Sequence, residues 1–177
     1  DVVRTALAAQ GLQTDLPPVL TSPAASRRRA AFSARRTKKS ATVGFHARGS
    51  DVIIDIPECQ LVHPDLRAAR PALAALTTLG ASRKAELSIT LTRFDQGLDV
   101  AISGGKTLDG PLRAALAQHV AEHRYARLSW NGEVVAMQTP LLQRFGNAAV
   151  TPPPGSFLQA TDAGEAALVR GVQNVIG

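Results

Sequence analysis

Seven basic residues stand within the thirteen positions from Arg27 to Lys39, and no acidic residue stands among them. Guanidinium groups bind phosphate through paired hydrogen bonds and also stack on bases. Alternate side chains of an extended strand share a face and lie about 7 Å apart, near the phosphate spacing of a nucleic-acid chain. The segment therefore favours a nucleic-acid surface over a solvated edge strand whose charges prevent aggregation. The seven residues are Arg27, Arg28, Arg29, Arg35, Arg36, Lys38 and Lys39.

The positive charge of the chain is confined to this segment. The 177 residues include 20 Lys and Arg against 14 Asp and Glu, which gives a net charge of +6. Without the seven basic residues of the segment, 13 basic residues remain against 14 acidic ones. Because a local excess of positive charge attracts polyanions while a dispersed one mainly aids solubility, the composition favours a nucleic acid as partner.

A second candidate site is the pattern His119-x-x-Glu122-His123. Two histidines four positions apart share one face of a helix and can hold zinc, with Glu122 as a general base. A third ligand would come from a following helix, where Glu165 and Asp162 are the acidic residues. The alternative is a polar helix end with histidines near the negative pole of the helix dipole. Because so short a pattern often occurs by chance, a metal-dependent hydrolase is the less favoured hypothesis.

Two further patterns carry no function by themselves. Residues 104–107 (GGKT) resemble the end of a phosphate-binding loop, but that loop requires glycine where Val100 stands. Cys59 is the only cysteine, so no intrachain disulfide can form, and a lone cysteine is ordinarily a small buried hydrophobe. The residues alone do not assemble a nucleophile with a base.

The elements that position these residues alternate between hairpins and helices. Alternating residues and turn signals predict strands at 26–36, 42–47, 51–56, 86–93, 98–102, 126–130, 133–137 and 147–151. Periodic apolar residues predict helices at 2–10, 63–79, 111–123 and 162–176. Asn131-Gly132 marks a hairpin, and Asp162 with Glu165 fits a capping box. Nothing suggests a βαβ unit, so the predicted fold class is α+β, an antiparallel β-sheet with helices packed on one face.

The ends of the chain suggest a piece of a longer protein, because the first residue is not Met and both ends fall within helical patterns. No uncharged apolar run approaches the ~20 residues that cross a bilayer, and no signal peptide is visible. We therefore expect a cytoplasmic protein without a membrane partner, and the oligomeric state stays open.

Three segments follow one another in an order that carries a family resemblance. They are SRRRAAFS at 26–33, VGF at 43–45 followed by DIPECQLVHP at 55–64, and GSFLQAT at 155–161. This ordered set resembles the RNA uracil-C5 methyltransferases, which make 5-methyluridine in ribosomal or transfer RNA. In that family an arginine-rich strand, a GF strand and a D…C segment are followed by an F-x-Q-x-N segment just before the S-adenosylmethionine domain. The resemblance covers most of the chain.

The resemblance implies roles in RNA binding. The family region that matches Arg27, Arg28 and Arg29 faces RNA, and we expect Arg35 and Arg36 to extend the same basic surface. Phe157 would pack beside a base, although without the resemblance its type favours the core.

The resemblance also implies contacts with cofactors. Gln159 matches the glutamine that contacts S-adenosylmethionine, and Thr161 stands where the family usually has Asn. Cys59 matches the fourth ligand of a four-iron four-sulfur cluster in the members that have one. The three upstream cysteines are absent here, so this chain by itself is not expected to bind that cluster.

The implied function is S-adenosylmethionine-dependent RNA modification of ribosomal or transfer RNA. Residues 1–151 would form a central RNA-facing domain, and residues 152–177 a linker and first helix that lead into a catalytic domain. The family's catalytic cysteine, base and glycine-rich cofactor loop would lie beyond Gly177, so we expect this chain alone to be inactive. The alternative from another class is a non-enzymatic RNA-binding module.

Overall fold

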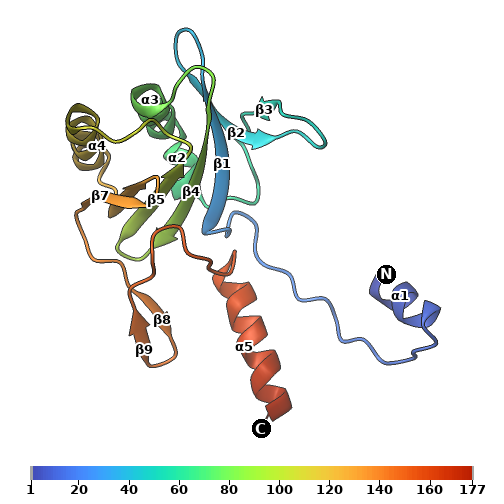
Figure 1. Cartoon of the computed structure of the whole chain (residues 1–177). Helices are drawn as coiled ribbons and strands as arrows, with labels where there is room; N and C mark the ends of the chain where they lie inside the picture. Colours follow the sequence, from blue (N-terminus) through green and yellow to red (C-terminus); the bar gives the residue numbers. More distant parts are fainter. Residues whose placement is uncertain (1, 177) are drawn as a thin grey trace.

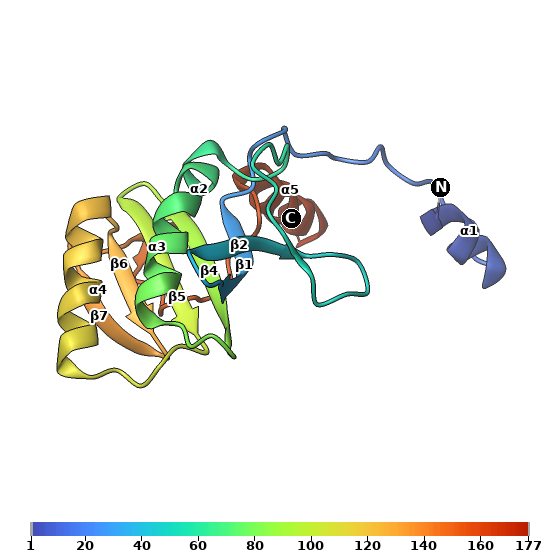
Figure 2. The ribbon, with the colours of Figure 1, turned by 90° about the horizontal axis from the view of Figure 1, so that it is seen from above.

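The computed structural model of the chain describes residues 2–176, with a seven-stranded sheet of order β3-β2-β1-β4-β5-β6-β7 at its centre (Figure 1). Helices cover one face of this sheet (Figure 2). The strands are β1 (Arg29–Arg36), β2 (Ala41–His46), β3 (Ile53–Ile54), β4 (Glu86–Phe94), β5 (Gly97–Ser103), β6 (Arg127–Trp130) and β7 (Glu133–Met137). The covering helices are α2 (Pro64–Ala68), α3 (Arg70–Gly80) and α4 (Gly110–His123). The predicted α+β class is confirmed.

The other elements lie outside this two-layer body. The hairpin of β8 (Gln143–Phe145) and β9 (Ala148–Val150) and the helix α5 (Asp162–Ile176) extend below the sheet, while α1 (Val2–Ala9) stands at the end of an extended segment (Figure 1). Neither α1 nor α5 has a buried residue. Across residues 2–176, no helix combines the length and the apolar character needed to span a bilayer. Asp1 and Gly177 are the outer ends of the predicted segments 1–151 and 152–177, and both residues lie outside the described residues.

Alternate side chains of β1 contribute to the core. Ala30, Phe32 and Ala34 are buried on the side that the helices cover, and they alternate with Ala31 and Ser33 on the other side. We call this second side the open face. Because the chain has few aromatic residues, the core is built largely of Leu, Ile, Val and Ala from the strands and from α2–α4.

Trp130 fills the core beside two glycines. A Cβ atom at Gly80 or at Gly105 would lie 2.1 Å from a carbon of the indole ring, so only glycine fits at these positions. The indole Nε1–H donates to the carbonyl of Lys106 at 2.8 Å, and the Gly105 N–H donates to Asn131 Oδ1 at 3.1 Å. The GGKT segment thus wraps an indole ring, which agrees with its exclusion as a phosphate-binding loop.

One neighbouring pair of strands is parallel, and the expectation of no βαβ unit is therefore wrong. Strand β5 pairs with β6 in parallel, with Val100 opposite Leu128, and α4 makes the crossover. The two hairpins β4–β5 and β6–β7 are antiparallel, as predicted. Turn residues encode pairing within each hairpin, whereas the pairing between hairpins depends on how their apolar faces pack.

Local differences from the predicted elements have identifiable causes. The helix predicted at 63–79 is two helices, because Pro71 stands in the first turn of α3, where it lacks the N–H of a continuing helix. The Asp162–Glu165 capping box is not formed. Thr161 caps α5 instead, since its Oγ1 accepts a hydrogen bond from the Gly164 N–H at 3.0 Å. Strand β3 is shorter than predicted, and β8 was not predicted.

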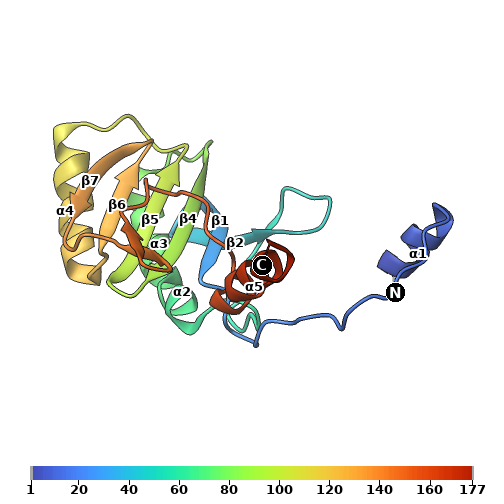
Figure 3. The same cartoon turned by 90° about the horizontal axis from the view of Figure 1, so that it is seen from below.

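A buried ion pair fastens the segment 152–155 to the open face, across which this part of the chain runs (Figure 3). Arg127 donates two hydrogen bonds to Asp99, at 2.8 and 3.0 Å, and both residues are buried. Arg127 also donates to the Pro152 carbonyl at 2.8 Å, and Asp99 accepts from the Gly155 N–H at 3.3 Å. The pair is thus fully engaged, which a buried charge requires.

Asp99→Asn is expected to lower the free energy of unfolding by about 3–5 kcal/mol, because it leaves the charge of Arg127 buried without its counter-ion. Urea unfolding followed by circular dichroism measures this change. The matched control is Glu133→Gln, which removes an exposed partner of Arg113 and should cost less than about 1 kcal/mol. Equal effects of the two changes would contradict the role given to the buried pair.

Candidate nucleic-acid interface

The seven basic residues do not form one surface. They lie on both faces of the sheet and at both ends of strand β1. Strand alternation places Arg29 and Arg35 on the open face and Arg36 on the other side. Arg29 and Arg35 also stand at opposite ends of the strand, about 20 Å apart along it. The expectation of a single dense patch is therefore wrong, and each end has its own surroundings.

Arg28 is an internal anchor rather than an exposed cation. Its side chain is only 8% exposed and pairs with Asp162 and Glu165 of α5, with 2.6 Å between Nη2 and the Glu165 carboxylate. Its Nε–H donates to the Gln159 carbonyl at 3.2 Å, and its backbone N–H donates to the Ala160 carbonyl at 2.8 Å. Arg28 holds the linker against β1, and we leave it out of the proposed RNA-binding set.

Arg29 and Phe157 form a pair at the same end of the strand. The guanidinium carbon of Arg29 lies 5.9 Å from the centroid of the Phe157 ring, and Nη2 donates to the Gly155 carbonyl at 3.3 Å. Phe157 is 73% exposed, so the composition-based expectation that it fills the core is wrong. An exposed aromatic ring beside a guanidinium offers a surface on which a base can stack. Arg27 is exposed next to this pair in the sequence.

The other end of β1 is strongly basic. Lys38 and Lys39 stand in the turn between β1 and β2, and the loop before β4 lies beside this turn because Arg35 pairs with Glu86 in the register (Figure 1). We call the group of basic residues in these two loops and at the end of β1 the basic end. Its members are Arg35, Arg36, Lys38, Lys39, Arg83 and Lys84. Within residues 2–176, no ion pair is found for any of them except Arg35.

The contribution of Arg83 and Lys84 to the basic end was missed from the sequence. These two residues lie 44 or more positions beyond Lys39, and only the register of β4 against β1 brings them near it. The signal that could have found them is the alternating pattern of β4 together with a correct choice of its partner strand.

A polar strip of the open face joins the two ends. Ala31 pairs with Thr90, and Ser33 pairs with Ser88. A hollow of about 410 Å³ lies beside them, lined in part by Ser103 and by Pro153 of the linker. The strip therefore presents hydroxyl groups between the Arg29–Phe157 pair and the basic end.

The residues expected to contact cofactors lie away from the basic end. Gln159 is half-buried on the linker, and no hydrogen bond of its side-chain amide is found among the described residues. Its carboxamide is suited to a ligand that carries both a carboxylate and an ammonium group. Cys59 is a half-buried free thiol that packs against the core. One thiolate does not fit a four-iron cluster, which needs four such ligands.

His119 lies in the helix layer, away from the open face. It is buried, and burial together with the neighbouring His123 imidazole lowers its pKa to about 4, so the ring is neutral at neutral pH. Glu165 cannot serve as the third ligand that the hydrolase hypothesis required, because it pairs with Arg28 at the other side of the molecule.

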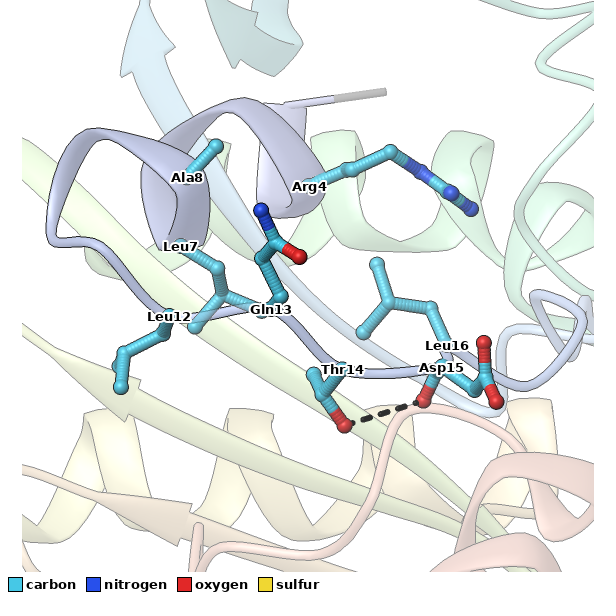
Figure 4. Close-up of a pocket in the computed structure, with 8 residues that line it drawn as sticks. All are labelled: Arg4, Leu7, Ala8, Leu12, Gln13, Thr14, Asp15 and Leu16. Atoms are coloured by element: carbon cyan, nitrogen blue, oxygen red, sulfur yellow. Dashed lines mark hydrogen bonds between the residues drawn. The ribbon is translucent and has the colours of Figure 1, made fainter.

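A separate hollow of about 460 Å³ lies between α1 and residues 12–16 (Figure 4). Leu7, Leu12 and Leu16 line it together with Arg4 and Asp15. None of the residues singled out from the sequence lines this hollow, so it is not part of the candidate interface.

Glu86 stands between the Arg35 guanidinium and the His46 imidazole beside the basic end. Its carboxylate lies 2.8 Å from Arg35 Nη2 and 2.8 Å from His46 Nε2. Burial acts to raise the pKa of Glu86, but hydrogen bonds with Ser33 and His46 outweigh it and lower the pKa. The hydrogen bond to Glu86, supported by the carbonyl of Ser50, raises the pKa of His46.

The raised pKa of His46 predicts a pH dependence that NMR titration of its imidazole protons can measure. Folding should be favoured by this group below the unfolded value of 6.5, and that contribution should fade as the pH rises through the higher folded value. Glu86→Gln should lower the pKa of His46, while the distant change Glu133→Gln should not. A His46 that titrates at or below 6.5 in the unchanged chain would contradict this.

Comparison with known proteins gives relatives over nearly the whole chain. A protein from Caulobacter vibrioides is 41% identical over 179 residues, which cover 95% of this chain and 42% of that protein. One from Brucella suis biovar 1 is 37% identical over 165 residues, covering 93% and 40%. One from Rhizobium meliloti is 33% identical over 177 residues, covering 100% and 43%. Each carries the name uncharacterized RNA methyltransferase.

No protein-family model matches the chain. The chain spans about two-fifths of the length of the curated relatives it matches. At 33–41% identity over 93% or more of its residues, the chain is thus similar to about two-fifths of each of these proteins, and this similarity is consistent with an RNA methyltransferase family.

Proposed function

We propose that this chain is the RNA-facing part of an S-adenosylmethionine-dependent RNA methyltransferase that modifies uracil C5 in ribosomal or transfer RNA. The names of the relatives support RNA methylation in general. The uracil-C5 reaction is supported by the resemblance of the segments 26–33, 43–64 and 155–161 to that family. The observation that carries the RNA-facing role is the polar strip of the open face, with an aromatic–guanidinium pair at one end and the basic end at the other.

In this proposal a single RNA strand lies along the strip. Lys38 and Lys39 neutralise phosphates at the basic end, and Arg35 joins them when a phosphate replaces Glu86 as its partner. Phe157 stacks on an unpaired base, with the guanidinium of Arg29 beside the ring. The hydroxyl groups of Ser33, Ser88 and Thr90 lie between these contacts and can bond to ribose or phosphate oxygens.

Residues 1–151 would then position RNA, and residues 152–177 would lead into the part of the protein that transfers the methyl group. The linker is suited to that task because buried contacts hold it at two places, at Asp99–Arg127 and at Arg28. Gln159 lies at the second of these anchors, because its carbonyl accepts from Arg28, and its side chain would contact the methyl donor from the linker. S-adenosylmethionine supplies the methyl group when it is bound, and the methyl transfer itself is proposed to take place outside these 177 residues.

Lys38→Gln/Lys39→Gln is expected to weaken binding of a uridine-containing single-stranded RNA, because two phosphate contacts are lost. The slope of log K against log salt concentration should become shallower by about 0.7 for each contact. Fluorescence anisotropy over a series of salt concentrations measures both quantities.

The matched control for this pair is Arg113→Gln/Arg124→Gln, which removes two positive charges from α4 and its C-cap in the helix layer. If the control changes the salt slope as much as the lysine pair does, then RNA binding depends only on the net charge of the chain, and the proposed interface is wrong.

A further inference from the structure

The last turn of α4 brings two imidazoles and a carboxylate together. One ligand atom from each of His119, Glu122 and His123 lies within 4.8 Å of the others. These residues stand at positions i, i+3 and i+4, which share one face of a helix. His119 is buried, whereas Glu122 and His123 are exposed. One side of the cluster is therefore buried in the core, and the other side is exposed to solvent.

Tyr125 completes the surroundings of this cluster. Its ring centroid lies 5.8 Å from that of His119 and 6.0 Å from that of His123, and the two imidazole centroids are 4.3 Å apart. Two buried polar atoms here, His119 Nε2 and Tyr125 Oη, have no hydrogen-bond partner among the described residues. Buried polar atoms are nearly always satisfied, so the unpartnered imidazole nitrogen of His119 points to an additional ligand.

We propose that His119, Glu122 and His123 bind a divalent transition-metal ion, for which Zn²⁺ is the probe. Two imidazoles and one carboxylate are a donor set that zinc accepts in proteins. Ligand atoms about 2.1 Å from a tetrahedral ion are about 3.4 Å apart, so distances between the ligand atoms must shorten by up to about 1.4 Å on binding. The exposed side chains of Glu122 and His123 can make this movement, since neither is held by core packing.

A neighbouring amide already orients the carboxylate. Gln118 Nε2 donates to Glu122 Oε1 at 2.8 Å, which leaves the second carboxylate oxygen for the ion. Partners of this kind hold metal ligands in place in known sites. The sequence pattern required a third ligand from a following helix, but in the structure the acidic residue within the pattern itself completes the set.

This site would be separate from the proposed RNA strip. Helix α4 covers the face of the sheet opposite the open face (Figure 2), and the polar strip lies on the other side of β5 and β4. An ion held here would fix the last turn of α4 next to the start of β6, where Tyr125 enters the core. Zinc binding at this site therefore does not depend on the RNA-facing function.

Titration of the untagged chain with ZnCl₂ in a calorimeter tests the site. We expect one ion per chain, and we expect His123→Ala to weaken binding by at least about tenfold, since it removes a ligand. Glu122→Gln should weaken it as well. His123 and Glu122 are exposed, so these variants should keep the fold, which circular dichroism checks; His119→Ala is avoided because that side chain is buried in the core.

Two control variants separate this site from other zinc-binding residues. His46→Ala and Cys59→Ser remove an exposed imidazole and the only thiol, and both should leave the zinc affinity unchanged. The absence of stoichiometric binding would show that the cluster is only a polar helix end and would overturn the proposal. Binding that survives His123→Ala, or that is lost in Cys59→Ser, would overturn it too.

Discussion

The position of the linker over the sheet depends on how three arginines hold one irregular segment. Arg127, whose buried partner on the open face is Asp99, bonds to the carbonyl of Pro152, and Arg29 bonds to that of Gly155. Arg28 bonds to the carbonyl of Gln159 and to the acidic residues at the start of α5. A guanidinium can do this because it carries five donors in a rigid plane, enough to satisfy a carboxylate and a backbone carbonyl at once. The linker is thereby fixed over the sheet, and it brings Phe157 to the surface.

The same residue type therefore has two different tasks along one strand. At the start of β1, Arg28 and Arg29 bond to the linker, and Arg28 is almost completely buried. At the other end, the charges around the β1–β2 turn have few partners within the chain and project from the end of the sheet. Seven like charges in thirteen residues would repel one another on one surface. Division between two ends and two faces reduces that repulsion, and it leaves the far end with a positive potential suited to a polyanion.

The sequence was sufficient where structure is determined locally. The Asn131-Gly132 turn, the alternation of β4 and β5, and the period of α4 each reflect neighbours in the chain, and the structure confirms these elements. Contacts between distant segments were not predictable in the same way. Asp162 and Glu165 suggested a helix cap, but they pair with Arg28, which lies 134 and 137 positions away. Likewise the parallel pairing of β5 with β6 and the place of Arg83 near the β1–β2 turn follow from packing and register, which no short pattern encodes.

The most direct test of the account is a map of where RNA touches the chain. A single-stranded RNA containing 4-thiouridine would be cross-linked to the chain by light, and the cross-linked peptides identified by mass spectrometry. The account predicts cross-links at Phe157 and along β1 and β4, at Ala31, Ser33, Ser88 or Thr90. Cross-links confined to α3 and α4 would place RNA on the helix layer and would contradict the proposal that the open face binds it.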